Sequence, residues 1–218
     1  MKLLLTSGGL ENETIITALK DLTGQPFEKL NLAFIPTAAN AEGGDKWWLI
    51  KDLEVLKKLG FAVVDIVDIS ALPKEIWKKR LEKADVLFFS GGNVFHLMHW
   101  IKKSGLRELL PELLKTRVYV GVSAGSIVVC PSLMFVTFEK EAAEEVNGKV
   151  SEDGLKLVNF FIEPHANNPH FPELTFDAVL EESKRTSLPV YALDDQSAIK
   201  IVDGEIDVVS EGTWKKFN

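Results

Sequence analysis

Cysteine is almost absent from this chain, since its 218 residues include only one, Cys130. A single thiol excludes an intramolecular disulfide framework, and so we expect a cytoplasmic protein that folds in a reducing compartment. Cys130 lies in an apolar stretch just before Pro131. In that setting a small buried residue is far more common than a reactive thiol.

Positive charge is also scarce. The 25 Lys and Arg residues are outnumbered by 32 Asp and Glu, which leaves a formal net charge of −7. Nucleic-acid binding needs a basic face, and this balance gives it no support. We therefore expect no nucleic-acid partner.

Long apolar runs, repeats and flexible linkers are missing as well. The first apolar run, residues 1–6, stops at Ser7-Gly8-Gly9 and is too short for a signal peptide or a membrane span. Hydrophobic residues still make up 46% of the chain, which is enough for a sizeable core. We expect a single domain over residues 1–218, with no membrane partner.

The N-terminal part of the chain alternates strand-like and helix-like patterns. Strand-like runs lie at 3–6, 31–35, 61–69 and 85–89, and another precedes Ser123. Helical spacing of apolar residues occupies the segments between them, at 12–22, 47–59, 73–81, 93–100 and 105–115. Strands separated by helices predict an α/β fold with a mostly parallel sheet and helices on both faces.

The pattern changes after residue 130. Leu133–Phe138 is predicted to be extended, and the charged segment 139–154 contains the turn signal Asn147-Gly148. Further strands are expected at 159–162, 190–193, 198–202 and 206–209, with a helix near 173–185. The last two strands flank Asp203-Gly204, a hairpin turn. Antiparallel strands added at the end of the parallel sheet are the simplest account.

The segment Gly121-Val122-Ser123-Ala124-Gly125 matches G-x-S-x-G, the nucleophile elbow of serine hydrolases. A serine in a tight strand-to-helix turn presents its hydroxyl at the carboxyl edge of a sheet. The free N–H groups of the following helix point at the same place, where they can stabilise an oxyanion. We therefore predict Ser123 as a nucleophile, against the alternative of a tight turn without chemistry.

A serine nucleophile needs a base, and the chain has four histidines. His165 is the first choice because Glu163-Pro164-His165 directly follows an expected strand end. His170 lies in the same loop and is the second choice. The other two, His96 and His99, are one helical turn apart and lack a clear third ligand. We expect these two histidines to pack against neighbouring helices or to lie at the surface, and we expect no metal site.

The imidazole in turn needs a carboxylate that orients it. Asp194 and Asp195 follow the strand at 190–193, and Glu139 and Glu163 are rivals. Spacing alone does not choose between them.

Several segments, taken together in this order, resemble the dipeptidase E family of serine peptidases, family S51, which also includes the cyanophycinases. They are Ser-Gly-Gly-Asn-Val-Phe-His-Leu (90–97), Gly-Val-Ser-Ala-Gly-Ser (121–126), Pro-His-Ala-Asn-Asn (164–168) and Leu-Asp-Asp-Gln-Ser-Ala-Ile (193–199). The resemblance extends from the first strand to about residue 202. It implies a sheet like that of the class I glutamine amidotransferases, which is flavodoxin-like, with serine in place of cysteine at the elbow.

The resemblance also implies roles for individual residues. Ser123 matches the family's nucleophile and His165 its histidine, while Asp195 stands where the family usually has glutamate. Some members have an essential acid about fifteen residues after the serine; here that position is Phe138, and its neighbour Glu139 stays an alternative. The implied oxyanion donors are the backbone N–H groups of two residues, Gly92 and Ala124.

The implied activity is hydrolysis of short peptides through an acyl-enzyme, without a cofactor. Aspartyl dipeptidases hold the substrate carboxylate with a basic residue downstream of the histidine, but residues 166–180 contain no Arg or Lys. His170 is a weak substitute, so a preference for N-terminal Asp stays open. Two alternatives also stay open: a regulatory or non-catalytic small-molecule-binding protein on the same fold, and an esterase. A homo-oligomer is possible under each of them.

Overall fold

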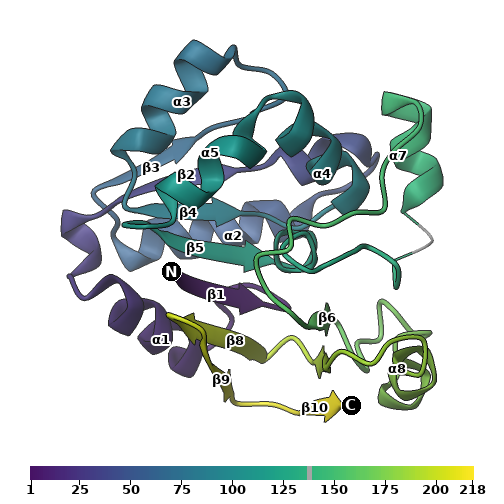
Figure 1. Ribbon diagram of the computed structural model, residues 1–218. Coiled ribbons are helices and arrows are strands. Elements are labelled where there is room, and N and C mark those ends of the chain that lie inside the picture. Colours follow the sequence, from purple (N-terminus) through teal and green to yellow (C-terminus); the bar gives the residue numbers. More distant parts are fainter. Residues whose placement is uncertain (137–138) are drawn as a thin grey trace.

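The computed structural model describes residues 1–136 and 139–218, and a seven-stranded sheet forms its centre (Figure 1). The strand order is β3-β2-β4-β5-β1-β8-β9. Neighbours from β3 to β1 are parallel, whereas β8 and β9 are antiparallel. This confirms the predicted α/β fold and its antiparallel C-terminal strands. The bounds are β1 Lys2–Thr6, β2 Asn31–Ile35, β3 Val63–Ile66, β4 Val86–Phe89, β5 Val118–Val122, β8 Ser197–Val202 and β9 Glu205–Ser210.

Helices cover both faces of this sheet. In Figure 1, α3, α4 and α5 lie in front of the strands and α2 lies behind them. The two faces carry separate apolar clusters, one shared with α3 to α5 and one with α1 and α2. The bounds are α1 Glu13–Thr23, α2 Trp47–Leu59, α3 Lys74–Lys83, α4 Val94–Lys103 and α5 Leu106–Leu113, with short 3₁₀ turns at Phe27–Lys29 (η1) and Thr37–Ala41 (η2).

Local signals in the sequence place the ends of these helices. The Asn12 side chain accepts a hydrogen bond from the Ile15 N–H at 2.9 Å and caps α1. Gly60 ends α2 with φ 79°, a left-handed conformation that glycine adopts without steric cost. Pro73 directly precedes α3, as expected.

A smaller sheet lies beside the large one. Its order is β10-β7-β6, formed by β6 Phe161–Glu163, β7 Val190–Leu193 and β10 Trp214–Phe217, with α8 Phe176–Ser183 between β6 and β7 in sequence. The sequence patterns predict β6 and β7 but not β10. Because β7 pairs with β6 on one side and β10 on the other, these strands form a sheet of their own.

The region after residue 130 differs most from expectation. An extended segment is wrong for residues 133–136, where the Val136 N–H donates to the Leu133 carbonyl in a turn; residues 137–138 lie outside the described ranges. The charged segment contains a helix, α7 Lys140–Asn147. Its turn signal is the end of this helix, since Gly148 has φ 74°.

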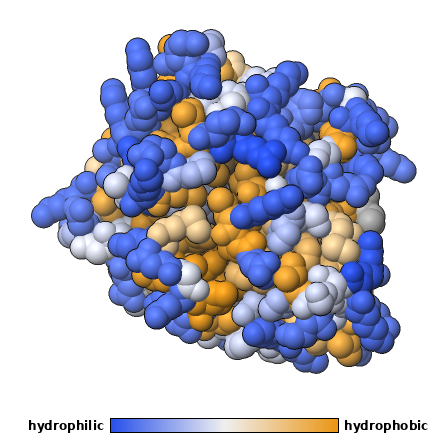
Figure 2. Space-filling model, in the orientation of Figure 1, coloured by the Kyte–Doolittle hydropathy of each residue, from blue (hydrophilic) through white to orange (hydrophobic). Residues whose placement is uncertain are grey.

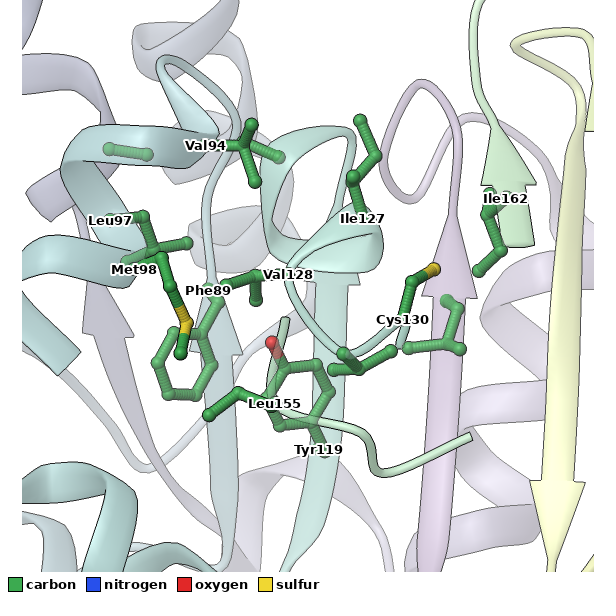
Figure 3. Packing of buried hydrophobic residues seen from close by; sticks show 14 of the residues in the cluster. Phe89, Val94, Leu97, Met98, Tyr119, Ile127, Val128, Cys130, Leu155 and Ile162 are labelled. Atoms are coloured by element: carbon green, nitrogen blue, oxygen red, sulfur yellow. The ribbon is translucent and has the colours of Figure 1, made fainter. Parts of the chain in front are cut away.

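Buried aromatic residues support the turn that follows β5. The rings of Phe89 on β4 and Tyr119 on β5 stack with centroids 4.7 Å apart (Figure 3). The Tyr119 hydroxyl donates to the Gly125 carbonyl at 2.6 Å. Cys130 is buried in the same cluster, where burial raises the pKa of its thiol to about 12. The core is therefore packed tightly up to the turn at Ser123.

The surface in the orientation of Figure 1 is mostly hydrophilic, with an apolar area near its middle (Figure 2). None of the helices in the described ranges is both long and apolar enough to span a bilayer.

Candidate active site

Ser123 occupies a strongly bent turn between β5 and the short helix α6, Ala124–Ile127. Its φ of 47° and ψ of −108° are unusual for a residue with a side chain. The flanking glycines allow close backbone contacts: a Cβ atom on Gly121 would lie 2.5 Å from the Gly125 carbonyl oxygen, and one on Gly125 would lie 2.2 Å from the Phe89 carbonyl oxygen. The glycines are therefore required by backbone packing at this turn.

The end of β1 anchors the same turn. The Thr6 carbonyl accepts hydrogen bonds from the Ser123 N–H at 3.1 Å and from the Ser126 hydroxyl at 2.8 Å. The Thr6 hydroxyl donates to the Gly121 carbonyl at 2.8 Å. No sequence pattern assigns a role to Thr6 or Ser126. For Thr6, the available signal is a polar residue that directly follows the apolar run Leu3-Leu4-Leu5.

His165 reaches Ser123 from the loop after β6. Its Nε2 lies 2.9 Å from the Ser123 Oγ. The backbone of His165 has φ 62°, and its N–H donates to the Ser7 hydroxyl at 2.7 Å. The imidazole stacks on the Phe171 ring with centroids 4.7 Å apart. Backbone and ring are thus both held in place.

Asp195 lies on the other side of this imidazole. Its Oδ1 is 2.6 Å from the His165 Nδ1 and accepts a second hydrogen bond from the Ser7 hydroxyl at 2.9 Å. The Asn168 side-chain amide donates to Oδ2. Burial alone would raise the pKa of Asp195, but the hydrogen bonds from His165, Ser7 and Asn168 hold it below its ordinary value. The carboxylate is therefore kept ionised beside the histidine.

The other candidate acids have different partners. Asp194 accepts from the Ser197 hydroxyl at 2.6 Å and closes the turn before β8. Glu139 accepts from the Val94 N–H at 2.6 Å, at the start of α4. Within the described residues, neither carboxylate is hydrogen-bonded to a histidine.

The two backbone donors named from the sequence both lie beside Ser123. Gly92 follows β4 with φ 122°, and a Cβ atom on its neighbour Gly91 would lie 3.6 Å from the Ser123 Cβ. Ala124 is the first residue of α6. Its N–H therefore belongs to the unpaired N–H groups that every helix start carries.

The remaining histidines lie elsewhere. The Asn147 amide, at the end of α7, donates to the His96 Nδ1 at 2.8 Å, and burial lowers the pKa of His96. His99 follows one turn later on α4, and His170 faces the Trp47 ring with centroids 6.0 Å apart. No group of three or more His, Cys, Asp or Glu in residues 1–136 and 139–218 is arranged to hold a metal ion.

A cavity of about 480 Å³ opens beside Ser123 and His165. This volume falls in the usual range for small-ligand sites. Aromatic side chains line part of it, namely Trp47, Trp48 and Phe171. Carboxyl groups line much of the rest, from Glu11, Glu42, Asp52, Glu139, Glu163 and Asp195.

This combination of fold and site defines an α/β protein with an elbow serine, a histidine and a carboxylate joined by hydrogen bonds. The sequence model of peptidase family S51 matches residues 3–209, and the chain belongs to that family, among proteins of the peptidase E type.

Individual relatives agree with this assignment. An uncharacterised peptidase of Listeria innocua is 29% identical over 176 residues, which cover 80% of this chain and 82% of that protein. A peptidase E of Nostoc sp. is 27% identical, over 91% of this chain and 79% of the relative. A crystal structure of a Listeria monocytogenes protein assigned as a peptidase E superposes with a TM-score of 0.82 at 26% identity, covering 97% of this chain and 98% of the other.

Proposed function

We propose that this protein is a serine peptidase that hydrolyses short peptides through an acyl-enzyme on Ser123. The observation that carries the proposal is the hydrogen-bonded chain from the Ser123 Oγ through His165 to Asp195, at the wall of the cavity. Membership of a peptidase family supplies the reaction class. The cavity volume of about 480 Å³ suits a short peptide better than a folded chain.

The reaction begins with proton transfer. As the Ser123 Oγ attacks the scissile carbonyl carbon, the His165 Nε2 takes the hydroxyl proton. Asp195 accepts the hydrogen bond of the Nδ1–H, so the imidazole has the tautomer with a free Nε2 lone pair. The same carboxylate then stabilises the imidazolium that forms.

The tetrahedral intermediate carries an oxyanion, which the Gly92 and Ala124 N–H groups stabilise. The intermediate collapses as the imidazolium of His165 gives its proton to the leaving amine. A water molecule gives a proton to His165 and attacks the acyl carbonyl, and His165 passes this proton to the Ser123 Oγ as the ester bond breaks and the acid leaves. The serine proton thus goes to the leaving amine and is replaced by a proton from water, without a cofactor.

At the acid position, aspartate is one methylene shorter than the glutamate that is usual in the family. Here the shorter carboxylate is held by the Ser7 hydroxyl and the Asn168 amide as well as by the imidazole. We therefore assign Asp195 rather than Glu139 or Asp194 as the third member. Ser7 and Asn168 act as positioning residues.

The proposal also includes a cytoplasmic location for the protein. A reducing cytoplasm is the compartment that best suits a chain whose one cysteine is buried and free.

The test is a dipeptide panel hydrolysed by the wild type and by Ser123→Ala. We expect turnover by the wild type and a loss of at least about 10³-fold in kcat/KM in the variant. The control is Ser187→Ala, an exposed serine that should leave the rate unchanged. Equal cleavage by the wild type and Ser123→Ala would overturn the proposal. Turnover of simple esters without any peptide turnover would favour an esterase instead.

A further inference from the structure

The cavity beside Ser123 is lined by an unusual excess of acidic groups. Six carboxylate residues contribute to its wall, whereas Lys51 is the one Lys or Arg among the described lining residues. The Lys51 ammonium is already bound by Glu11 at 2.6 Å. The described wall therefore offers no free cation to an acidic substrate.

Glu163 is the most informative of these carboxylates. It ends β6, two residues before His165, and only 8% of its surface is exposed. It lines the cavity, and in the described ranges its carboxylate has neither a hydrogen-bond donor nor an ion-pair partner. Burial of a carboxylate without a partner is costly, and such a group is expected to meet a ligand.

Two further carboxylates reinforce this wall. Asp52 on α2 is also only 8% exposed and has no hydrogen-bond partner among the described residues. Among the described residues, the Glu139 carboxylate accepts one hydrogen bond, from the Val94 N–H. Three different segments of the chain thus direct carboxylates at one cavity.

The raised pKa values of two of these carboxyl groups are those expected when no positive charge lies close to them. Burial, together with the nearby carboxylates of Glu139 and Glu182, raises the pKa of Glu163 to about 8. Burial likewise raises the pKa of Glu139 to about 8, with Glu42 contributing. A positively charged ligand group would reverse both effects, because an opposite charge at close range favours the ionised carboxylate. An aspartyl side chain would instead add repulsion.

We propose that Glu163, together with Glu139 and Asp52, forms a subsite for a positively charged side chain of the substrate. Peptides with Lys or Arg beside the scissile bond are then preferred over aspartyl peptides. This inference rests on the proposed peptidase function for its catalytic readout. It deepens that function by naming a substrate class that the absence of Arg and Lys from residues 166–180 already favours over an aspartyl peptide.

The kinetic experiment compares dipeptides that differ only in charge. Lys-Leu, Arg-Leu, norleucyl-Leu and Asp-Leu are assayed, together with the reversed peptides. Norleucine keeps the straight side chain of lysine without its ammonium group. We expect kcat/KM for a cationic residue in one of the two positions to exceed that for norleucine at least tenfold, and that for aspartate at least a hundredfold. Equal values for lysine and norleucine, or a preference for aspartate, overturn the proposal.

The variant Glu163→Gln keeps the shape of the side chain and removes its charge. We expect its ratio of kcat/KM for the lysyl peptide to kcat/KM for the norleucyl peptide to fall to within threefold of one. The matched control is Glu205→Gln, at the exposed start of β9 and outside the cavity, which should retain the wild-type ratio. Glu139→Gln serves as a second variant should Glu163→Gln fail to fold. An unchanged ratio in a folded variant contradicts the subsite.

A binding experiment separates this inference from the proposed function. Calorimetry on Ser123→Ala measures affinity for the same peptides without turnover. Tighter binding of Lys-Leu than of norleucyl-Leu, with no hydrolysis by the wild type, supports the subsite and contradicts the peptidase. Hydrolysis that prefers aspartate supports the peptidase and contradicts the subsite. N-acetylated peptides complete the set: if only acetylation weakens binding, the α-ammonium is the recognised group and the side-chain proposal is wrong.

Discussion

At the residue scale, the geometry around Asp195 depends on Ser7, a residue that belongs to no recognisable sequence motif. Ser7 accepts the His165 N–H at 2.7 Å and donates to Asp195 at 2.9 Å, so one hydroxyl holds two members of the proposed triad. It follows β1 directly and is fully buried. The position of a single serine after a strand says nothing about this bridge, because both partners come from distant parts of the chain.

Removing this hydroxyl should impair catalysis without removing any reacting atom. We expect Ser7→Ala to lower kcat about 10- to 100-fold, since the His165 backbone and the Asp195 carboxylate both lose a positioning contact. The pKa of Asp195 should also rise, because a hydrogen bond to its ionised form is lost. Steady-state kinetics and the acid limb of the pH–rate profile measure both effects. A profile identical to that of the wild type would contradict the positioning role.

The choice of acid is a second prediction at this scale. Asp195→Asn preserves shape but removes the charge beside Nδ1, so we expect kcat to fall about 10³- to 10⁴-fold. Asp194→Asn and Glu139→Gln should each cost less than about tenfold on an uncharged peptide, because neither contacts the histidine. The three rates, measured side by side, decide the assignment. A larger loss in Glu139→Gln than in Asp195→Asn would reverse it.

The sequence predicts those parts of the site that depend on local interactions, and it does not predict those that depend on long-range contacts. Ser123 and His165 each lie in a short segment whose local shape depends on neighbouring residues. The G-x-S-x-G motif therefore identifies Ser123, and the preceding strand end identifies His165. Asp195 and Asp194 are adjacent and chemically alike. Only the approach of the His165 loop to the end of β7 separates them, since the Ala166 N–H donates to the Leu193 carbonyl. That contact is long-range and leaves no local signal.

At the element scale, the turn at Ser123 depends on glycines that permit backbone contact. A methyl group on Gly125 would overlap the Phe89 carbonyl oxygen, at 2.2 Å. We expect Gly125→Ala to lower the free energy of unfolding by about 2–4 kcal/mol, because neither backbone segment can move away in the packed core. Urea denaturation measures the loss. Gly43→Ala is the control, since nothing lies within 4 Å of its added Cβ; an equal effect in both variants would contradict the account.

Two elements escaped prediction for the same physical reason. Helix α7 has eight residues and buries one of them, Ala143, so its helical pattern is too short to stand out in the sequence. Strand β10 is mostly exposed and is fixed by antiparallel pairing with β7. Both elements depend on tertiary contacts for their structure. In contrast, β1, β4 and β5 are continuous buried runs, which can be recognised as strands from their apolar sequence.

At the scale of the whole molecule, buried carboxylates link stability to pH. The pKa of Glu163 is raised from 4.5 to about 8 in the folded chain, so the folded state holds a proton that the unfolded state releases above pH 4.5. This group therefore lowers stability progressively as pH rises from about 4.5 to 8. Glu163→Gln should be more stable relative to wild type at pH 8 than at pH 5, by about 1–4 kcal/mol. Denaturation at both pH values tests this, and a difference independent of pH would contradict it.

The most direct test of the account is covalent labelling of the folded protein with a fluorophosphonate, followed by peptide mapping by mass spectrometry. The account predicts one adduct, on Ser123, formed by the wild type and absent from Ser123→Ala. Labelling should also slow at least about a hundredfold in His165→Gln, which loses the base that activates the hydroxyl. An unlabelled Ser123 in the folded wild type, or a labelling rate unaffected by loss of the imidazole, would contradict the central claim.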